Sequence, residues 1–148
     1  EIISKSDKQT KKLGKLFAKE TIRDRSRTSI KKALVTSLEG DLGAGKTTFT
    51  QGFANGLGIK ESPKSPTFVI QRIYKIKNKK FTNLIHIDAY RIKSKDLKIL
   101  GWESFLRNPK NIILIEWGDR IKNILPKNSA RVLFGHKNIN ERIIKFIK

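Results

Sequence analysis

The stretch "GDLGAGKTT", residues 40–48, decides the fold because it fits the pattern G-x-x-x-x-G-K-S/T through Lys46 and Thr47. An apolar, strand-like run precedes it at 33–40, and helical character follows over 47–57. Between a buried strand and a helix, such a turn points backbone N–H groups into one concavity, and the helix N-terminus adds positive potential. The sequence therefore predicts that this glycine-rich loop (residues 40–48) holds the phosphates of a nucleotide.

The side chains of the loop suit the same chemistry. Lys46 reaches the β- and γ-phosphates as a mobile charge, the Thr47 hydroxyl suits Mg²⁺, and Thr48 is within range of the α-phosphate. The glycines permit backbone turns that a side chain would forbid. The predicted nucleotide-binding residues of the loop are Asp41, Leu42, Gly43, Ala44, Gly45, Lys46, Thr47 and Thr48.

The remaining pattern predicts an α/β domain. An amphipathic helix over 6–20 starts at the N-cap Ser6 and places Leu13, Leu16 and Phe17 on one face, and basic, irregular residues follow it to residue 32. The other expected elements are a β-hairpin of strands 67–76 and 81–90, helical turns at 96–106 and 117–126, a buried strand at 111–117, and a second hairpin of strands 130–136 and 141–147. This order predicts a three-layer, P-loop NTPase-like α/β fold with a mixed β-sheet, and we expect residues 1–148 to form a single domain.

Two carboxylates are candidates for the metal side of the site. Asp88 ends the apolar run "NLIHID", and Glu116 ends the run "IILIE". Magnesium bound to nucleotide phosphates takes one or two carboxylates from neighbouring strands. Position alone leaves open which of the two acids holds the metal, so both are candidate catalytic residues together with Lys46.

Composition excludes several classes of protein. The chain has no cysteine, which excludes disulfides, thiolate metal sites and a cysteine nucleophile. No apolar run approaches the roughly 20 residues that span a bilayer, and no secretory signal opens the chain, so we expect a cytoplasmic protein without membrane contact. The formal net charge is +20 and comes mostly from lysine. Either a lysine-rich proteome or a polyanionic partner such as tRNA explains it.

Four stretches in this order resemble the TsaE family, bacterial ATPases that take part in making threonylcarbamoyladenosine on tRNA. They are "EGDLGAGKTT" (39–48), "KSPTF" (64–68), "HIDAYR" (86–91) and "IEWGD" (115–119). The resemblance covers about residues 34–126 and depends on the combination, because the glycine-rich loop alone is not specific to this family.

The resemblance implies an ATP- and Mg²⁺-dependent ATPase that acts with TsaD- and TsaB-like proteins, with tRNA as the substrate of the complex. It implies that Lys46 and Thr47 bind phosphate and Mg²⁺ and that Glu116 is the metal-side acid. Thr67 would lie near the γ-phosphate, and Asp88 would act in hydrolysis or at the partner interface. In-line attack of water on the γ-phosphate, slow without partners, is the expected reaction.

Several residues have structural interpretations instead. We expect His86 to make a structural hydrogen bond and Trp102 to pack in the core. Trp117 is either a core aromatic or, by the resemblance, a neighbour of the nucleotide. Arg91 and Arg120 are candidates for an arginine that neutralises transition-state charge.

Two other functions remain open. A small-molecule or nucleotide kinase on the same fold would need an arginine-rich lid segment, which the sequence does not show. A basic RNA-binding module with a vestigial nucleotide site would bind RNA regardless of ATP.

Overall fold

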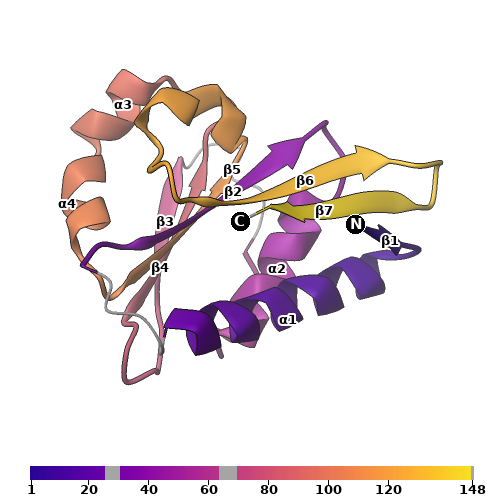
Figure 1. Cartoon of the computed structure of the whole chain (residues 1–148), viewed down its shortest axis with the longest axis horizontal. Coiled ribbons are helices and arrows are strands. Elements are labelled where there is room, and N and C mark those ends of the chain that lie inside the picture. The colour runs from indigo at the N-terminus through magenta and orange to yellow at the C-terminus, as the bar shows by residue number, and fades with distance from the viewer. Residues whose placement is uncertain (26–30, 64–69, 148) are drawn as a thin grey trace.

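The structure is a computed structural model that describes residues 1–25, 31–63 and 70–147. These residues form one seven-stranded sheet with helices on both of its faces (Figure 1). The strands are β1 (Ile2–Ser4), β2 (Leu34–Gly40), β3 (Gln71–Lys75), β4 (Asn83–Asp88), β5 (Asn111–Glu116), β6 (Ala130–His136) and β7 (Arg142–Ile147).

The sheet is mixed, as predicted, in the order β1-β7-β6-β2-β5-β4-β3. Its centre is parallel, because β2 pairs in parallel with both β5 and β6, and β5 pairs in parallel with β4. The outer strands run antiparallel: β3 to β4, β7 to β6, and β1 to β7. Both predicted hairpins, β3–β4 and β6–β7, are therefore confirmed.

Helices cover the two faces of the sheet and complete the three layers. The longer helices α1 (Asp7–Arg25) and α2 (Lys46–Gly56) pack on one face. The short helices α3 (Ser94–Ile99) and α4 (Trp102–Arg107) and the 3₁₀ segment η1 (Gly118–Ile124) cover the other (Figure 1). Trp102 is 1% exposed in this second layer, so its predicted packing role is confirmed.

Strand β5 shows why the core has two halves. All six of its residues are buried, and successive side chains point to opposite faces of the sheet. Ile112 and Leu114 join the apolar cluster under α1 and α2, whereas Ile113 and Ile115 join the cluster under the short helices. A continuous apolar run is what a parallel strand covered on both faces requires.

The helices α1 and α2 approach each other closely because glycines face the contact. A Cβ atom on Gly52 would lie 1.9 Å from the backbone oxygen of Lys11, and one on Gly14 would lie 2.2 Å from the oxygen of Phe49. No real side chain fits at such distances, so both positions require glycine. The contact holds α1 beside the helix that begins at the glycine-rich loop.

The N-terminal region corrects the sequence analysis in three ways. Helix α1 does not end at residue 20 but continues to Arg25, through residues predicted to be irregular. The strand β1 was not predicted. Leu16, expected to share the apolar face of the helix with Leu13 and Phe17, is 52% exposed, while Leu13 and Phe17 pack against the core.

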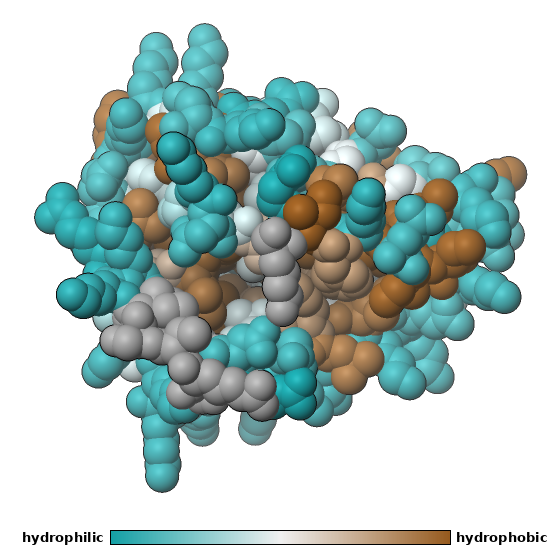
Figure 2. Space-filling view, viewed as in Figure 1, coloured by the Kyte–Doolittle hydropathy of each residue, from teal (hydrophilic) through white to brown (hydrophobic). Residues whose placement is uncertain are grey.

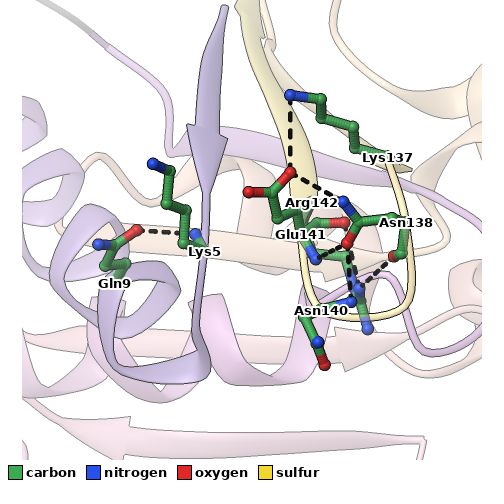
Figure 3. Close-up of polar contacts among 7 residues, drawn as sticks. All are labelled: Lys5, Gln9, Lys137, Asn138, Asn140, Glu141 and Arg142. Carbon is green, nitrogen blue, oxygen red and sulfur yellow. Dashed lines mark hydrogen bonds and ion pairs between the residues drawn. The ribbon is translucent and has the colours of Figure 1, made fainter.

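The start of α1 is as predicted: Ser6 Oγ accepts the backbone N–H of Gln9 at 3.1 Å, and the Gln9 side chain accepts the N–H of Lys5 at 2.7 Å (Figure 3). Apolar residues gather beside β7 on the face shown in Figure 2, where α1 and β7 border a shallow depression of about 570 Å³. Among the described helices, none combines the length and the apolar character needed to cross a membrane.

Candidate functional site

The glycine-rich loop lies at the carboxyl edge of the parallel strands. It leaves β2 at Gly40 and enters α2 at Lys46, and its glycines carry the left-handed backbone that it needs, with φ of +144° at Gly40 and +105° at Gly45. The strands β4 and β5 end at the same edge, where Asp88 and Glu116 are register partners. The topology thus gathers the loop and both candidate acids in one place, where parallel α/β sheets bind ligands.

The Lys46 ammonium group turns inward onto its own loop. It donates hydrogen bonds to the backbone oxygens of Gly40 and Asp41, the latter at 2.8 Å, and lies 3.9 Å from the centre of the Trp117 ring. Lys46 is only 5% exposed. Burial lowers the pKa of this amine, and the carboxylate of Glu116 opposes the shift. The charge is therefore held in the loop by carbonyl oxygens and a π-face, both of which a phosphate group can replace.

Glu116 joins the loop to the sheet. Its side chain is buried, and Oε1 accepts a hydrogen bond from the Thr47 hydroxyl at 2.8 Å. Its second oxygen, Oε2, lies 2.6 Å from Nε2 of His86 on the neighbouring strand β4. Both oxygens are thus fixed, and the carboxylate points at the loop threonine. His86 makes a hydrogen bond, as predicted, and its partner is the metal-side candidate itself.

Asp88 occupies a different environment. Its Oδ1 accepts the backbone N–H of Tyr90 at 2.9 Å, and in the part of the chain that the structure describes its carboxylate makes no hydrogen bond to Thr47. Burial raises the pKa of Asp88, the Tyr90 hydrogen bond opposes the shift, and the nearby Glu116 charge raises it further. The two acids of one site therefore differ in environment: Glu116 is fixed to the loop, whereas burial raises the pKa of Asp88 above its usual value.

An aromatic cluster borders the site. Trp117 adopts a left-handed backbone with φ of 63°, and its backbone N–H donates to the backbone oxygen of Leu38 at 2.8 Å. Its ring centre lies 4.9 Å from that of Tyr90, and the Arg120 guanidinium stacks over both rings and donates to the backbone oxygen of Tyr90 at 3.0 Å. Trp117 therefore packs at the edge of the core and covers the Lys46 amine at the same time.

The turn after Trp117 depends on a close approach. A Cβ on Gly118 would lie 1.9 Å from the Ser37 hydroxyl oxygen, so only glycine fits there. Ser37 in turn donates to Glu39, which forms a two-point ion pair with Arg131, with nitrogen–oxygen distances of 3.0 and 2.8 Å. The Arg131 hydrogen bonds lower the pKa of Glu39. This polar chain supports β2 just before the loop, and the sequence analysis did not identify it.

The C-terminal hairpin contacts the tip of the loop from outside. Arg142 Nε donates to the Gly43 oxygen at 3.3 Å, and His136 Nε2 lies 3.4 Å from the Leu42 oxygen. Arg142 is itself held by backbone oxygens of the β6–β7 turn, in which Asn138 accepts two backbone N–H groups (Figure 3). A contact between residues 99 positions apart leaves no local signal, which is why sequence reasoning missed it.

The predicted loop residues differ in burial. Asp41, Leu42 and Gly43 are exposed, whereas Ala44 is fully buried. Gly45, Thr47 and Thr48 are half-buried. Thr67, predicted near the γ-phosphate, lies outside the described residues. Arg91 is exposed on the turn after β4.

The oxygen donors at the site fit a magnesium ion that is bound at the same time by the phosphates of a nucleotide. Within the described ranges, no group of three or more histidine and carboxylate side chains forms a metal site by itself. Magnesium bound to nucleotide does not need one, because phosphate oxygens and water fill most of its positions. The Thr47 hydroxyl with the adjoining Glu116 carboxylate supplies the hard oxygen donors such an ion takes from the protein.

Comparison with known proteins agrees with this geometry. The family model described as "Threonylcarbamoyl adenosine biosynthesis protein TsaE" matches residues 4–144. A Rickettsia typhi protein named tRNA threonylcarbamoyladenosine biosynthesis protein TsaE is 40% identical over 145 residues, covering 97% of this chain and 91% of the relative. A Bacillus subtilis protein of the same name is 40% identical over 112 residues, which is 76% of this chain and 68% of the relative.

A solved structure extends the likeness to three dimensions. The crystal structure of Bacillus subtilis YdiB superposes with a TM-score of 0.71 at 33% identity, over 98% of this chain and 82% of that one. The family match spans all of the elements from α1 to β6, including the glycine-rich loop and both candidate acids. The chain therefore belongs to the TsaE family of threonylcarbamoyl adenosine biosynthesis proteins.

Proposed function

We propose that this chain is the Mg²⁺-dependent ATP-binding and ATP-hydrolysing component of the machinery that makes threonylcarbamoyladenosine on tRNA. One observation carries the proposal: the Thr47 hydroxyl of the glycine-rich loop lies 2.8 Å from the buried Glu116 carboxylate. A buried carboxylate that faces the loop threonine is suited to hold the cation that binds together with a nucleotide.

Several groups of the chain would together bind the phosphates of the nucleotide and its Mg²⁺. The backbone N–H groups of the glycine-rich loop and the N-terminus of α2 would surround the phosphates. Lys46 would leave the oxygens of Gly40 and Asp41 and pair with the β- and γ-phosphates. Thr47 and Glu116 would hold Mg²⁺, which supplies charge neutralisation of the phosphate oxygens.

The hydrolytic step would use the second acid. We assign to Asp88 the orientation of the attacking water, because its raised pKa makes it a better proton acceptor than an ordinary carboxylate. Its Oδ1 is fixed by the Tyr90 N–H, which leaves Oδ2 to accept a hydrogen bond from water. The water would attack the γ-phosphate in line, and Lys46 would stabilise the developing charge.

Partners would set the rate. Arg120 is stacked on Tyr90 and Trp117, and no arginine among the described residues hydrogen-bonds to Glu116. We therefore expect slow hydrolysis by the chain alone and faster hydrolysis with TsaD- and TsaB-like proteins in the cytoplasm, where tRNA is the substrate of the complex.

The test is a titration of the wild type and Lys46→Ala with Mg-ATP, Mg-ADP and Mg-GTP, with Lys95→Ala on α3 as the matched control. We expect adenine-selective binding that only Lys46→Ala abolishes, and phosphate release that rises when the TsaD–TsaB pair is added. Fast release without partners, at tens per second, would refute partner dependence. A phosphorylated small product would favour a kinase, and absence of nucleotide binding would favour an RNA-binding module.

A further inference from the structure

A second candidate site lies away from the glycine-rich loop, in a groove between α1 and α2. The groove has a volume of about 680 Å³. Exposed side chains of α1 form one wall, Gln51 and Asn55 of α2 border the other, and Leu16 and Ile59 supply apolar surface. Six lysines line it: Lys8, Lys11, Lys12, Lys15, Lys19 and Lys60.

The lysines of α1 follow the helix in a regular row. Positions 8, 12, 15 and 19 are separated by four, three and four residues, a spacing that places side chains on one face of a helix. At 1.5 Å per residue the row is roughly 16 Å long. All four side chains are exposed. The row is thus a linear arrangement of positive charge and not a scatter of lysines over the helix.

The positive charge of the groove is almost uncompensated. Glu61 is the one acidic residue among the described residues that line it. None of the six lysines has a carboxylate partner among the ion pairs of the described chain, and Glu20 of α1 pairs instead with Arg23. Like charges held together in a groove raise the local concentration of a polyanion and strengthen its encounter with the protein.

We propose that this groove binds a single-stranded segment of RNA through its phosphates. The choice of RNA over an acidic protein surface rests on the proposed function, in which tRNA is the substrate of the complex. It also rests on the linear lysine row, which matches a chain of phosphates better than a patch of carboxylates. The groove has no aromatic residue on which a base could stack, so binding is independent of base sequence.

The groove is separate from the nucleotide site. Its lining includes neither Lys46 nor Glu116, and it borders the middle of α2, whereas the glycine-rich loop borders the beginning of that helix. RNA binding therefore needs no nucleotide and survives the loss of Lys46. This separation makes failure of the RNA proposal distinguishable from failure of the ATPase proposal.

The test measures the affinity of a fluorescein-labelled, unstructured oligoribonucleotide by anisotropy between 50 and 200 mM salt, without nucleotide. The groove variant carries Lys→Gln at positions 8, 12, 15 and 19. The matched control carries Lys→Gln at positions 95, 98, 110 and 127, which are exposed and lie outside the groove. Glutamine keeps the helix propensity of lysine, so circular dichroism of both variants should match that of the wild type.

Each phosphate contact contributes about 0.7 to the slope of log affinity against log salt for single strands. Four contacts predict a slope of about 2.8, which corresponds to a roughly 50-fold loss of wild-type affinity across this salt range. The groove variant should lose that salt dependence and bind correspondingly weakly at 50 mM salt, while the control and Lys46→Ala keep most of the affinity. Equal losses in groove variant and control would show diffuse attraction and overturn the proposal. Unchanged RNA affinity in the groove variant would also overturn the proposal, including the case in which the variant loses only binding to an acidic partner protein.

Discussion

Replacing Gly52 with alanine should separate the two helices that carry the site and the lysine groove. The added Cβ would lie 1.9 Å from the backbone oxygen of Lys11, and 2.7 and 2.8 Å from two more backbone atoms of the same residue. Backbone atoms cannot rotate away as a flexible side chain does. Reaching an ordinary contact of 3.4 Å requires α1 to move by about 1.5 Å at this point.

The expected loss of stability follows from two opposing effects. Overpacking in a well-packed interior costs about 1–3 kcal/mol, and the rigid obstacle here places Gly52→Ala at the upper end of that range. Alanine regains about 1 kcal/mol of helix propensity relative to glycine. The net loss in the free energy of unfolding is about 2 kcal/mol, which lowers the melting temperature by roughly 4–8 °C for a chain of this length.

The assay is urea and thermal unfolding followed by circular dichroism. The matched control is Gly135→Ala in β6, where a Cβ would have no heavy atom within 4 Å, and we expect a change of at most about 0.5 kcal/mol. If Gly52→Ala is as stable as the wild type while the control behaves as expected, α1 does not lie against α2 as described, and the groove between them loses its structural basis.

Three further predictions concern the contacts around the site. His86→Ala should weaken Mg-ATP binding about 10–100-fold and slow phosphate release with it, because the Glu116 carboxylate that would hold Mg²⁺ loses the partner that fixes it; an equal loss of ATP binding in the absence of Mg²⁺ would contradict this role. Arg142→Ala removes a hydrogen bond to the loop worth about 1 kcal/mol, so nucleotide affinity should fall about fivefold with little change in melting temperature. Glu39→Gln should be less stable than the wild type at neutral pH. Because the Arg131 pair lowers the pKa of Glu39, its contribution is present above the usual carboxyl range and is lost as the pH falls through the lowered pKa. Unfolding at neutral and acidic pH should therefore show a difference that shrinks on acidification, and a constant difference would refute the role of the charge.

Local sequence signals predicted most of the architecture. The glycine-rich loop, the apolar run at β5 and the two hairpins carry their information in neighbouring residues, so pattern and spacing were enough. The strand β1 has only three residues, which is too short for any periodicity to be recognised. Residues 21–25 were expected to be irregular because several of them are charged. They contain neither glycine nor proline, so nothing in them stops a helix, and α1 continues to Arg25.

Contacts between distant residues explain what the sequence left open. Position alone did not separate Asp88 from Glu116, since both end buried strands. The structure distinguishes them by the hydrogen bond from Thr47, a residue 69 positions from Glu116. The contact of Arg142 with the loop depends on the pairing of β6 beside β2 in the sheet, which no local pattern encodes.

The position of β5 between β2 and β4 has a consequence for how the protein folds. Neighbouring strands lie about 4.8 Å apart, so without β5 a gap of roughly 10 Å separates β2 from the β3–β4 hairpin. Residues 111–116 follow both of these elements in the chain, and the hairpin has no parallel partner until they are inserted. Strand pairings between residues so far apart in the sequence form slowly. The glycine-rich loop and Glu116 therefore meet only when the central strand enters the sheet, and a refolding experiment should recover nucleotide binding in the same kinetic phase that protects the amides of β5 from exchange.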